Sequence, residues 1–421
     1  MPLLRRCIAA LAAVSAAALA VVPAATAQPA AQPAALPTAA IALGDSFISG
    51  EGAGDYQSVV DLNGTAQGFP GWGADNANAY FCHRSANASL LRASLPGISA
   101  RFNLACSGGQ PHDITSASAN RAKGRTVASQ LDQLRAVART HDIDFVLVGL
   151  GSNNSSFTFG DAASVCANRF IADAWTGWWE FWAYIGGPVP QAPCTAADLA
   201  TEAELNSATT ETTVALRALM DTLAEVDADG VHRIVLQDYT NPLPFDYAGE
   251  YHTQDGRADD RDKFRDLGAE RYAAGCPAHR ASLAAGHMFS TGLGNLVRNT
   301  HATLSAERPG RDLVYLNVQR AFDGARLCER TGSPGYALAT PIRLHDGTSG
   351  NVVTSLSGKD KIAIQRIANN CVTHFQTCQE SWHPNAGGHG VLAQCLSGAA
   401  TTGSRAVSCV RDANTGGISV G

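Results

Sequence analysis

Residues 40–50 read Ala-Ile-Ala-Leu-Gly-Asp-Ser-Phe-Ile-Ser-Gly. The stretch begins with a short apolar segment, residues 40–43, that is typical of a buried strand. It continues into Gly44, Asp45 and Ser46, which are residue types that favour a sharp turn. A serine that leaves a strand on such a turn is a candidate nucleophile. Because a hydroxyl needs a neighbouring base to remove its proton, the chain should supply that base elsewhere.

A candidate base lies far downstream, where residues 380–385 read Glu-Ser-Trp-His-Pro-Asn. His383 follows Glu380 by three residues, and Pro384 biases the histidine away from helical backbone and keeps it on a loop. We expect His383 to act as the base and Glu380 to orient it. The alternative for Glu380 is a solvated surface carboxylate, because a catalytic triad is recognised by geometry and not by spacing.

Short apolar runs alternate with helical patterns along the chain. The predicted strands are residues 40–43, 100–105, 145–150, 233–237 and 313–318. The predicted helices are residues 77–93, 127–140, 197–226, 282–305 and 385–398. This alternation predicts a three-layer α/β/α fold, in which helices cover both faces of a parallel sheet. Ser46, Gly108 and Asn153 each follow a predicted strand closely, so we expect them at the same carboxyl edge of the sheet.

The amino-terminal region has the pattern of a secretory signal peptide. Arg5 and Arg6 precede an apolar run over residues 8–22, and small residues lead to position 27, so we expect cleavage after Ala27. We expect residues 28–38 to form a flexible leader rich in alanine and proline. We expect residues 39–421 to form one catalytic domain with an insertion at about residues 155–193, and we expect the protein to be secreted.

The cysteine count agrees with export. Of eleven cysteines, Cys7 lies in the expected signal peptide, which leaves an even ten in an oxidising compartment. The expected pairs are Cys82–Cys106, Cys166–Cys194, Cys276–Cys328, Cys371–Cys378 and Cys395–Cys409. A zinc site is the alternative, but no CxxC pair occurs in the sequence, so we expect neither a metal nor another cofactor.

Charge excludes one class of partner. The formal net charge is −6, and removal of Arg5 and Arg6 makes it −8. A nucleic-acid-binding protein normally presents a basic face, so we expect no nucleic-acid partner. We expect a monomer.

Two further segments lie between Ser46 and His383. Residues 105–108 read Ala-Cys-Ser-Gly, and Gly108 lets the backbone approach a ligand and donate an N–H group. Residues 151–154 read Gly-Ser-Asn-Asn, and Asn153 offers a side-chain amide donor.

The four segments, in this order, resemble the four sequence blocks of the SGNH (GDSL) hydrolase superfamily, from about residue 39 to residue 390. Residues 50–54, Gly-Glu-Gly-Ala-Gly, are similar to an extension of the first block in secreted actinobacterial-type esterases and lipases. The resemblance implies a flavodoxin-like, five-stranded parallel sheet and hydrolysis of a carboxylic ester without a metal. It implies Ser46 as nucleophile and His383 as base. The backbone N–H groups of Ser46 and Gly108 and the Asn153 amide would be the oxyanion donors.

Two positions depart from the family pattern. Asn154 stands where the third block usually has an aspartate, and we expect altered local hydrogen bonding there without loss of catalysis. Glu380 stands where the last block usually has an aspartate. Some relatives orient the histidine with a main-chain carbonyl instead, so Glu380 and such a carbonyl remain the two alternatives.

Trp175, Trp178, Trp179 and Trp182 lie at helical spacing between Cys166 and Cys194. The functional interpretation is either a lid or acyl-chain wall beside the active site, or a surface that makes transient contact with a lipid or a polymer. The other interpretation is an aromatic plug buried under the insertion. The family resemblance implies an ester substrate, and we expect an ester of a lipid or of an acylated carbohydrate. A carbohydrate O-deacetylase with the same site and a non-catalytic carbohydrate- or surface-binding protein are the alternatives.

The acidic residues 255–262 lack EF-hand spacing, which favours a solvated loop over a calcium site.

Overall fold

The computed structural model describes residues 35–55, 59–60, 66–67, 82–122, 125–159, 162, 194–226, 232–243, 280–326 and 382–421. Residues Leu36–Gly421 form one compact unit. The expected signal peptide and most of the leader lie outside the described residues, as does most of the expected insertion at residues 155–193.

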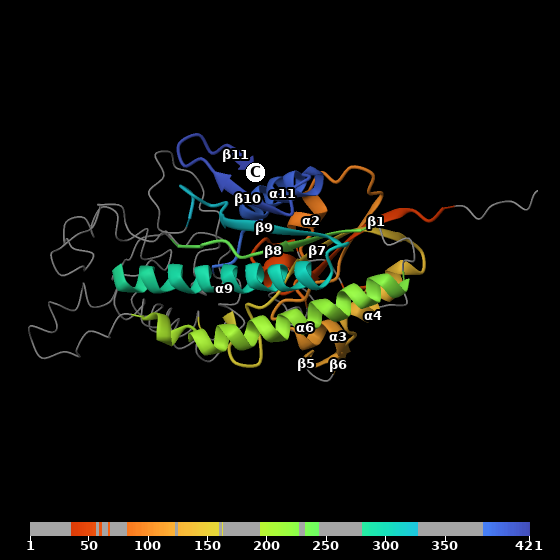
Figure 1. Cartoon of the computed structure of the whole chain (residues 1–421), viewed down its shortest axis with the longest axis horizontal. Helices are drawn as coiled ribbons and strands as arrows, with labels where there is room; N and C mark the ends of the chain where they lie inside the picture. The colour runs from red at the N-terminus through yellow and green to blue at the C-terminus, as the bar shows by residue number, and fades with distance from the viewer. Residues whose placement is uncertain are drawn as a thin grey trace, which may run out of the picture. The chain divides into compact units, whose positions relative to one another are not determined.

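A seven-stranded sheet forms the centre of this unit (Figure 1). Its strands lie in the order β11-β10-β9-β8-β7-β1-β4, and every neighbouring pair is parallel except β10 with β11. The bounds are β1 Thr38–Gly44, β4 Ala100–Asn103, β7 Asp142–Gly149, β8 Arg233–Gln237, β9 Asp312–Arg320, β10 Ala406–Arg411 and β11 Ile418–Val420. The described residues also contain two short antiparallel pairs, β2 (Val59–Val60) with β3 (Ala66–Gln67) and β5 (Ser118–Ala122) with β6 (Arg125–Val127).

All five predicted strands are present, as β1, β4, β7, β8 and β9. Their spatial order, β4-β1-β7-β8-β9, is the 2-1-3-4-5 order of flavodoxin-like sheets. The expected number of five was wrong, because β10 and β11 extend the sheet beyond β9. Along the first four residues of β10, exposed and buried side chains alternate, so this strand lacks the continuous apolar run that marks the central strands.

Helices cover both faces of the sheet (Figure 1). One layer contains α4 (Gln130–Ala138), α6 (Glu202–Val226) and α9 (Arg280–Glu307). The opposite layer contains α2 (Ser89–Arg92) and α11 (Ala386–Thr401). Ile41 and Leu43 of β1 pack toward the first layer, and Ala40 and Ala42 pack toward the second, as the twofold period of a strand requires. The short helices α1 (Ser46–Ser49), α3 (His112–Thr115) and η2 (Ala196–Asp198) lie in the connections.

The helix predicted for residues 77–93 was wrong over most of its described part, where only Ser89–Arg92 is helical. Cys82 forms a disulfide with Cys106, and His83 has a φ of +41°, which is incompatible with a continuous α-helix. Residues 77–81 lie outside the described residues.

Candidate functional site

Ser46 lies on a tight turn at the carboxyl end of β1. Gly44 has a φ of +134°, and a Cβ there would lie 1.9 Å from the carbonyl oxygen of Gly149, so only glycine fits between β1 and β7. The Asp45 side chain then caps α1 by accepting a 3.1 Å hydrogen bond from the Phe47 N–H. Ser46 is thus the first residue of α1, and only 4% of it is exposed.

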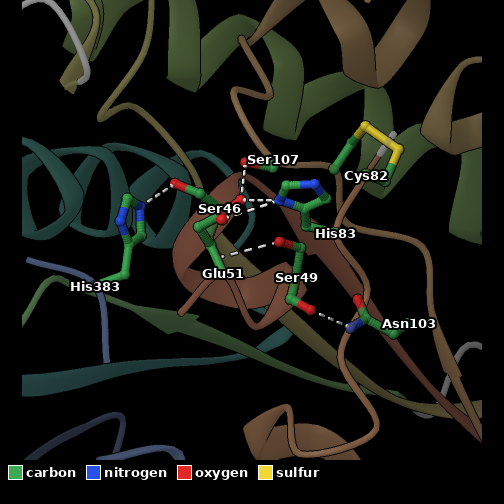
Figure 2. A network of polar contacts seen from close by, with 9 residues as sticks. Ser46, Ser49, Glu51, Cys82, His83, Asn103, Ser107 and His383 are labelled. Atoms are coloured by element: carbon green, nitrogen blue, oxygen red, sulfur yellow. Dashed lines mark hydrogen bonds and ion pairs between the residues drawn. A yellow bond between two sulfur atoms is a disulfide. The ribbon is translucent and has the colours of Figure 1, made fainter. Parts of the chain in front are cut away.

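His383 faces this serine (Figure 2). Its Nε2 lies 2.7 Å from the Oγ of Ser46, although 337 residues separate the two in the chain. The His383 ring lies beside the rings of Phe47 and Phe159, each with a centroid distance of 5.1 Å, and is almost fully buried. The structure therefore places an imidazole within hydrogen-bonding distance of the candidate nucleophile, in a setting that limits its movement.

Asp45, next to the serine, joins the ends of three strands. Its Oδ2 accepts hydrogen bonds from the Ser152 Oγ, at 2.6 Å, and from the Tyr239 hydroxyl, at 2.5 Å. The Tyr239 oxygen in turn accepts a 3.0 Å bond from the Ser152 N–H. Burial raises the pKa of Asp45 to about 6, although the hydrogen bonds from Ser152, Tyr239 and Phe47 act in the opposite direction. The turn is thus fixed by residues that follow β7 and β8.

Gln130, at the start of α4, holds Gly44 from the other side. Its Oε1 accepts a 2.7 Å bond from the Gly44 N–H, and its Nε2 donates a 2.8 Å bond to the Gly44 carbonyl. Sequence reasoning missed both Gln130 and Tyr239. The available signal for Tyr239 was its position two residues after the predicted strand 233–237.

The two other sequence blocks lie against this turn. Gly108 has a φ of +69°, and a Cβ on Gly109 would lie 2.6 Å from the Gly44 carbonyl oxygen, so the glycine pair packs directly on the end of β1. Asn153 is buried, and its Oδ1 accepts a 3.0 Å bond from the Phe159 N–H. Its Nδ2 makes two long contacts of 3.4 Å with described residues, to the Gly109 carbonyl and the Ser152 Oγ.

Asn154, where the family pattern has aspartate, stabilises the loop after β7. Its Oδ1 accepts hydrogen bonds from the N–H groups of Ser156, at 2.8 Å, and Phe157, at 3.1 Å. Its Nδ2 contacts the Gly151 carbonyl at 3.4 Å. An amide at this position thus makes local loop contacts.

A second buried group of polar residues lies behind Ser46, as Figure 2 shows. The Glu51 carboxylate accepts hydrogen bonds from the Ser107 Oγ, at 2.5 Å, and contacts His83 Nδ1 at 2.7 and 2.9 Å. The side chains of Glu51 and His83 are fully buried. The sequence analysis included Glu51 only as part of the glycine-rich extension, residues 50–54. It did not predict His83 or Ser107 as site residues.

Two disulfides in the described part of the chain are among the expected pairs. Cys82–Cys106 ties the segment before α2 to the loop that carries Gly108, and Cys395–Cys409 ties α11 to β10. Cys194 is also disulfide-bonded. The remaining expected partners lie outside the described residues and their pairing stays a prediction: Cys166, Cys276, Cys328, Cys371 and Cys378.

Several other expectations also fall outside the described residues. These are Glu380 as the orienting carboxylate, the four tryptophans Trp175, Trp178, Trp179 and Trp182, and the acidic residues 255–262. Among the described residues, no cluster of three His, Cys, Asp or Glu side chains has the geometry of a metal site. In the same part of the chain, no helix is long and apolar enough to cross a membrane.

Neither a family model nor a curated protein matches the sequence. Among solved structures, a phospholipase A1 from Streptomyces albidoflavus NA297 matches with 15% identity and a TM-score of 0.43, over 87% of this chain and 100% of that one. A mutant of an acetyl-xylooligosaccharide esterase from Geobacillus Stearmophilus matches with 11% identity and a TM-score of 0.27, over 87% and 96% of the two chains. At these TM-scores neither similarity carries an argument about this chain. The interpretation of the site rests on its own geometry.

Proposed function

We propose that the protein is a serine hydrolase of carboxylic esters that forms an acyl-enzyme on Ser46. The observation that carries the proposal is the 2.7 Å contact between His383 Nε2 and Ser46 Oγ at the carboxyl edge of a parallel sheet. A nucleophile and a base within hydrogen-bonding distance are the signature of covalent catalysis by serine. The carboxyl edge of such a sheet is also where ligands of open α/β folds bind.

In the proposed reaction, His383 removes the proton of Ser46 while the serine oxygen attacks the ester carbonyl. The imidazolium then gives that proton to the leaving alcohol as the tetrahedral intermediate collapses to the acyl-enzyme. Water then adds to the acyl carbonyl while His383 takes its proton. When this second tetrahedral intermediate collapses, the bond to the Ser46 Oγ breaks, the acid leaves and the imidazolium returns the proton to the serine. Glu380 or a main-chain carbonyl would orient His383, as the sequence suggests.

Three donors are proposed for the oxyanion: the N–H groups of Ser46 and Gly108 and the Nδ2 of Asn153. In the described part of the chain, no hydrogen bond uses the backbone N–H of Ser46 or of Gly108, so both remain available to a ligand. Among the described residues, the Nδ2 of Asn153 makes contacts of 3.4 Å and none shorter, so a closer acceptor would replace them at little cost. Donors of this kind stabilise the charge that develops in the transition state.

Secretion is part of the proposal. The signal-peptide pattern of residues 1–27 and the disulfides Cys82–Cys106 and Cys395–Cys409 support it, because disulfides persist mainly in oxidising compartments. Amino-terminal sequencing of the protein recovered from culture medium should give Gln28 as the first residue.

A chain-length series of p-nitrophenyl esters, from acetate to palmitate, tests the activity and narrows the substrate. The oxidised mature protein should hydrolyse at least part of the series, and the Ser46→Ala variant should hydrolyse none of it. A long-chain preference would favour a lipase, whereas activity on acetate alone would favour deacetylation of a carbohydrate. Absence of hydrolysis by the folded wild type would contradict the general esterase proposal.

A further inference from the structure

The buried pair Glu51–His83 lies directly behind the proposed nucleophile and has no role in the reaction described above (Figure 2). Burying a carboxylate is unfavourable unless charges and hydrogen bonds compensate it. Here the compensation is extensive, because Glu51 contacts both His83 and Ser107. Replacing a buried ion pair by apolar residues is often neutral or stabilising, so stability alone is a weak reason for this arrangement.

Glu51 is connected by hydrogen bonds to both halves of the proposed site. Its backbone N–H donates a 3.1 Å bond to the Ser46 carbonyl, which links it to the nucleophile turn. Its carboxylate accepts the 2.5 Å bond from the Ser107 hydroxyl, which links it to the loop that carries Gly108. One residue thus connects the nucleophile with the residue that precedes a proposed oxyanion donor.

The loop around Ser107 is anchored on its other side as well. The Ser107 N–H donates a 3.1 Å bond to the Cys82 carbonyl, and the disulfide joins Cys82 to Cys106. His83 follows Cys82 and contacts the same Glu51 carboxylate. Ser107 is therefore held by its main chain and by its side chain, immediately before Gly108 turns with a positive φ.

The electrostatics agree with an ionised carboxylate at neutral pH. Burial alone would raise the pKa of Glu51, but the charge and hydrogen bond of His83, the charge of His383 and the hydrogen bond of Ser107 hold that pKa below its ordinary value. An ionised acceptor makes a stronger hydrogen bond to the Ser107 hydroxyl than a neutral one would.

We propose that Glu51, through its hydrogen bond to Ser107 and its contact with His83 Nδ1, is a positioning residue that aims the Gly108 N–H at the oxyanion. The inference rests on the proposed ester hydrolysis, because it assigns Glu51 a role in that reaction. Positioning acts only as charge develops on the substrate oxygen, so loss of Glu51 or of the Ser107 hydroxyl should affect the transition state and leave ground-state binding almost unchanged.

The test compares Ser107→Ala, Glu51→Gln and Ser107→Thr with a matched control, Ser397→Ala. Ser397 is a half-buried serine whose hydroxyl donates a hydrogen bond to the Ala393 carbonyl and accepts one from the Ser94 N–H. It lies about three helical turns beyond the start of α11, away from the sheet edge that carries Ser46. Near-UV circular dichroism and the thermal midpoint establish that each variant is folded.

With p-nitrophenyl acetate, Ser107→Ala and Glu51→Gln should lower kcat by about 10- to 100-fold with KM changed less than threefold, since full loss of one oxyanion donor costs about 10²–10³. Ser107→Thr, which keeps the hydroxyl, should restore most of kcat, and Ser397→Ala should match the wild type. A folded Ser107→Ala or Glu51→Gln variant with kcat within twofold of the wild type, or a loss seen only in KM, would overturn the inference.

The same variants can be compared without ester turnover, by the rate at which diethyl p-nitrophenyl phosphate phosphorylates Ser46. If the wild type is phosphorylated but hydrolyses no ester, the proposed function fails while the positioning role is still measured. In that case Ser107→Ala should react at least tenfold more slowly than the wild type, and an equal rate would overturn the inference. If the folded wild type undergoes neither reaction, both proposals are wrong.

Discussion

The hydroxyl of Tyr239 donates a 2.5 Å hydrogen bond to Oδ2 of Asp45, across 194 residues of sequence. Tyr239 is the second residue after β8, and Asp45 immediately precedes the proposed nucleophile, so this contact joins the end of β8 to the serine turn. Because the Tyr239 oxygen also accepts the Ser152 N–H, the ends of β1, β7 and β8 are fixed relative to one another at one buried point.

Tyr239→Phe should therefore destabilise the protein by about 1–3 kcal/mol, since it removes one hydrogen bond to a buried carboxylate and leaves a buried N–H without its acceptor. It should also lower kcat by about tenfold, because the serine turn loses a support. Tyr315→Phe is the matched control, as the Tyr315 hydroxyl donates a 2.7 Å bond to Oδ2 of another buried carboxylate, Asp238. Denaturant unfolding should give a comparable loss for both variants, whereas kcat should fall only for Tyr239→Phe. If kcat of Tyr239→Phe stayed at the wild-type value, as is expected for Tyr315→Phe, the serine turn would not need this bond.

The raised pKa of Asp45 predicts a dependence of stability on pH. The pKa is about 6 in the folded protein and 3.8 ordinarily, so the folded state binds this proton more tightly than the unfolded state. The contribution of Asp45 to the free energy of unfolding should therefore fall by about 3 kcal/mol as pH rises from about 4 through 6. The difference in unfolding free energy between the wild type and Asp45→Asn, measured from pH 4 to 7, isolates this contribution because other groups titrate in both proteins. A difference that does not change with pH would contradict the assignment.

Gly44→Ala should prevent correct folding or cost more than about 3 kcal/mol, because the added Cβ would lie 1.9 Å from the Gly149 carbonyl oxygen at a φ of +134°. Gly97→Ala is the control for backbone conformation alone. Gly97 has a φ of +81°, but a Cβ there would meet no atom within 4 Å, so its cost should be about 1 kcal/mol. Thermal unfolding of both variants separates the steric clash from the conformational cost, and equal losses would argue against close packing of β1 on β7.

The two disulfides should differ in their effect on catalysis. They close loops of similar length, with sequence separations of 24 and 14 residues, so replacing either pair by serines should cost about 3 kcal/mol of stability. Only the Cys82/Cys106 replacement should also lower kcat, because Cys106 precedes the Ser107–Gly108 loop. The kcat of each double variant is measured well below both thermal midpoints. An unchanged kcat in both double variants would show that the Cys82–Cys106 disulfide does not support the proposed oxyanion loop.

Asn153→Ala should lower kcat by about 10²–10³-fold, the usual effect of removing one oxyanion donor. The variant should keep its KM, because the donor acts mainly in the transition state. Initial rates over a range of p-nitrophenyl ester concentrations measure both constants. A variant with an unchanged kcat would remove Asn153 from the proposed set of donors.

The sequence allowed prediction of those parts of the fold and site whose residue types are dictated locally. A glycine before Ser46 and a proline after His383 mark the turn and the loop that the chemistry needs. The central strands were predicted because burial on both faces makes them continuously apolar. The strand β10 was missed because its alternating pattern, with Ser408 exposed and Cys409 buried, is typical of a strand that is buried on one face only.

The supporting residues were missed for a different reason. Gln130 contacts Gly44 across 86 residues, and His83 contacts Glu51 across 32. Neither residue type is unusual in its local sequence, and each acquires its partner only when separate strands and loops meet. Such contacts carry no periodicity or short motif, so the three-dimensional structure was needed to find them.

The central claim is that His383 activates Ser46 as a nucleophile, and the reaction with diethyl p-nitrophenyl phosphate tests it most directly. The oxidised mature protein should release one equivalent of p-nitrophenol, and peptide mass spectrometry should locate a single phosphoryl adduct on Ser46. His383→Ala should slow this reaction by at least 10²-fold, because the hydroxyl then lacks its base. An adduct on another residue, or an equal rate in a folded His383→Ala variant, would contradict the claim.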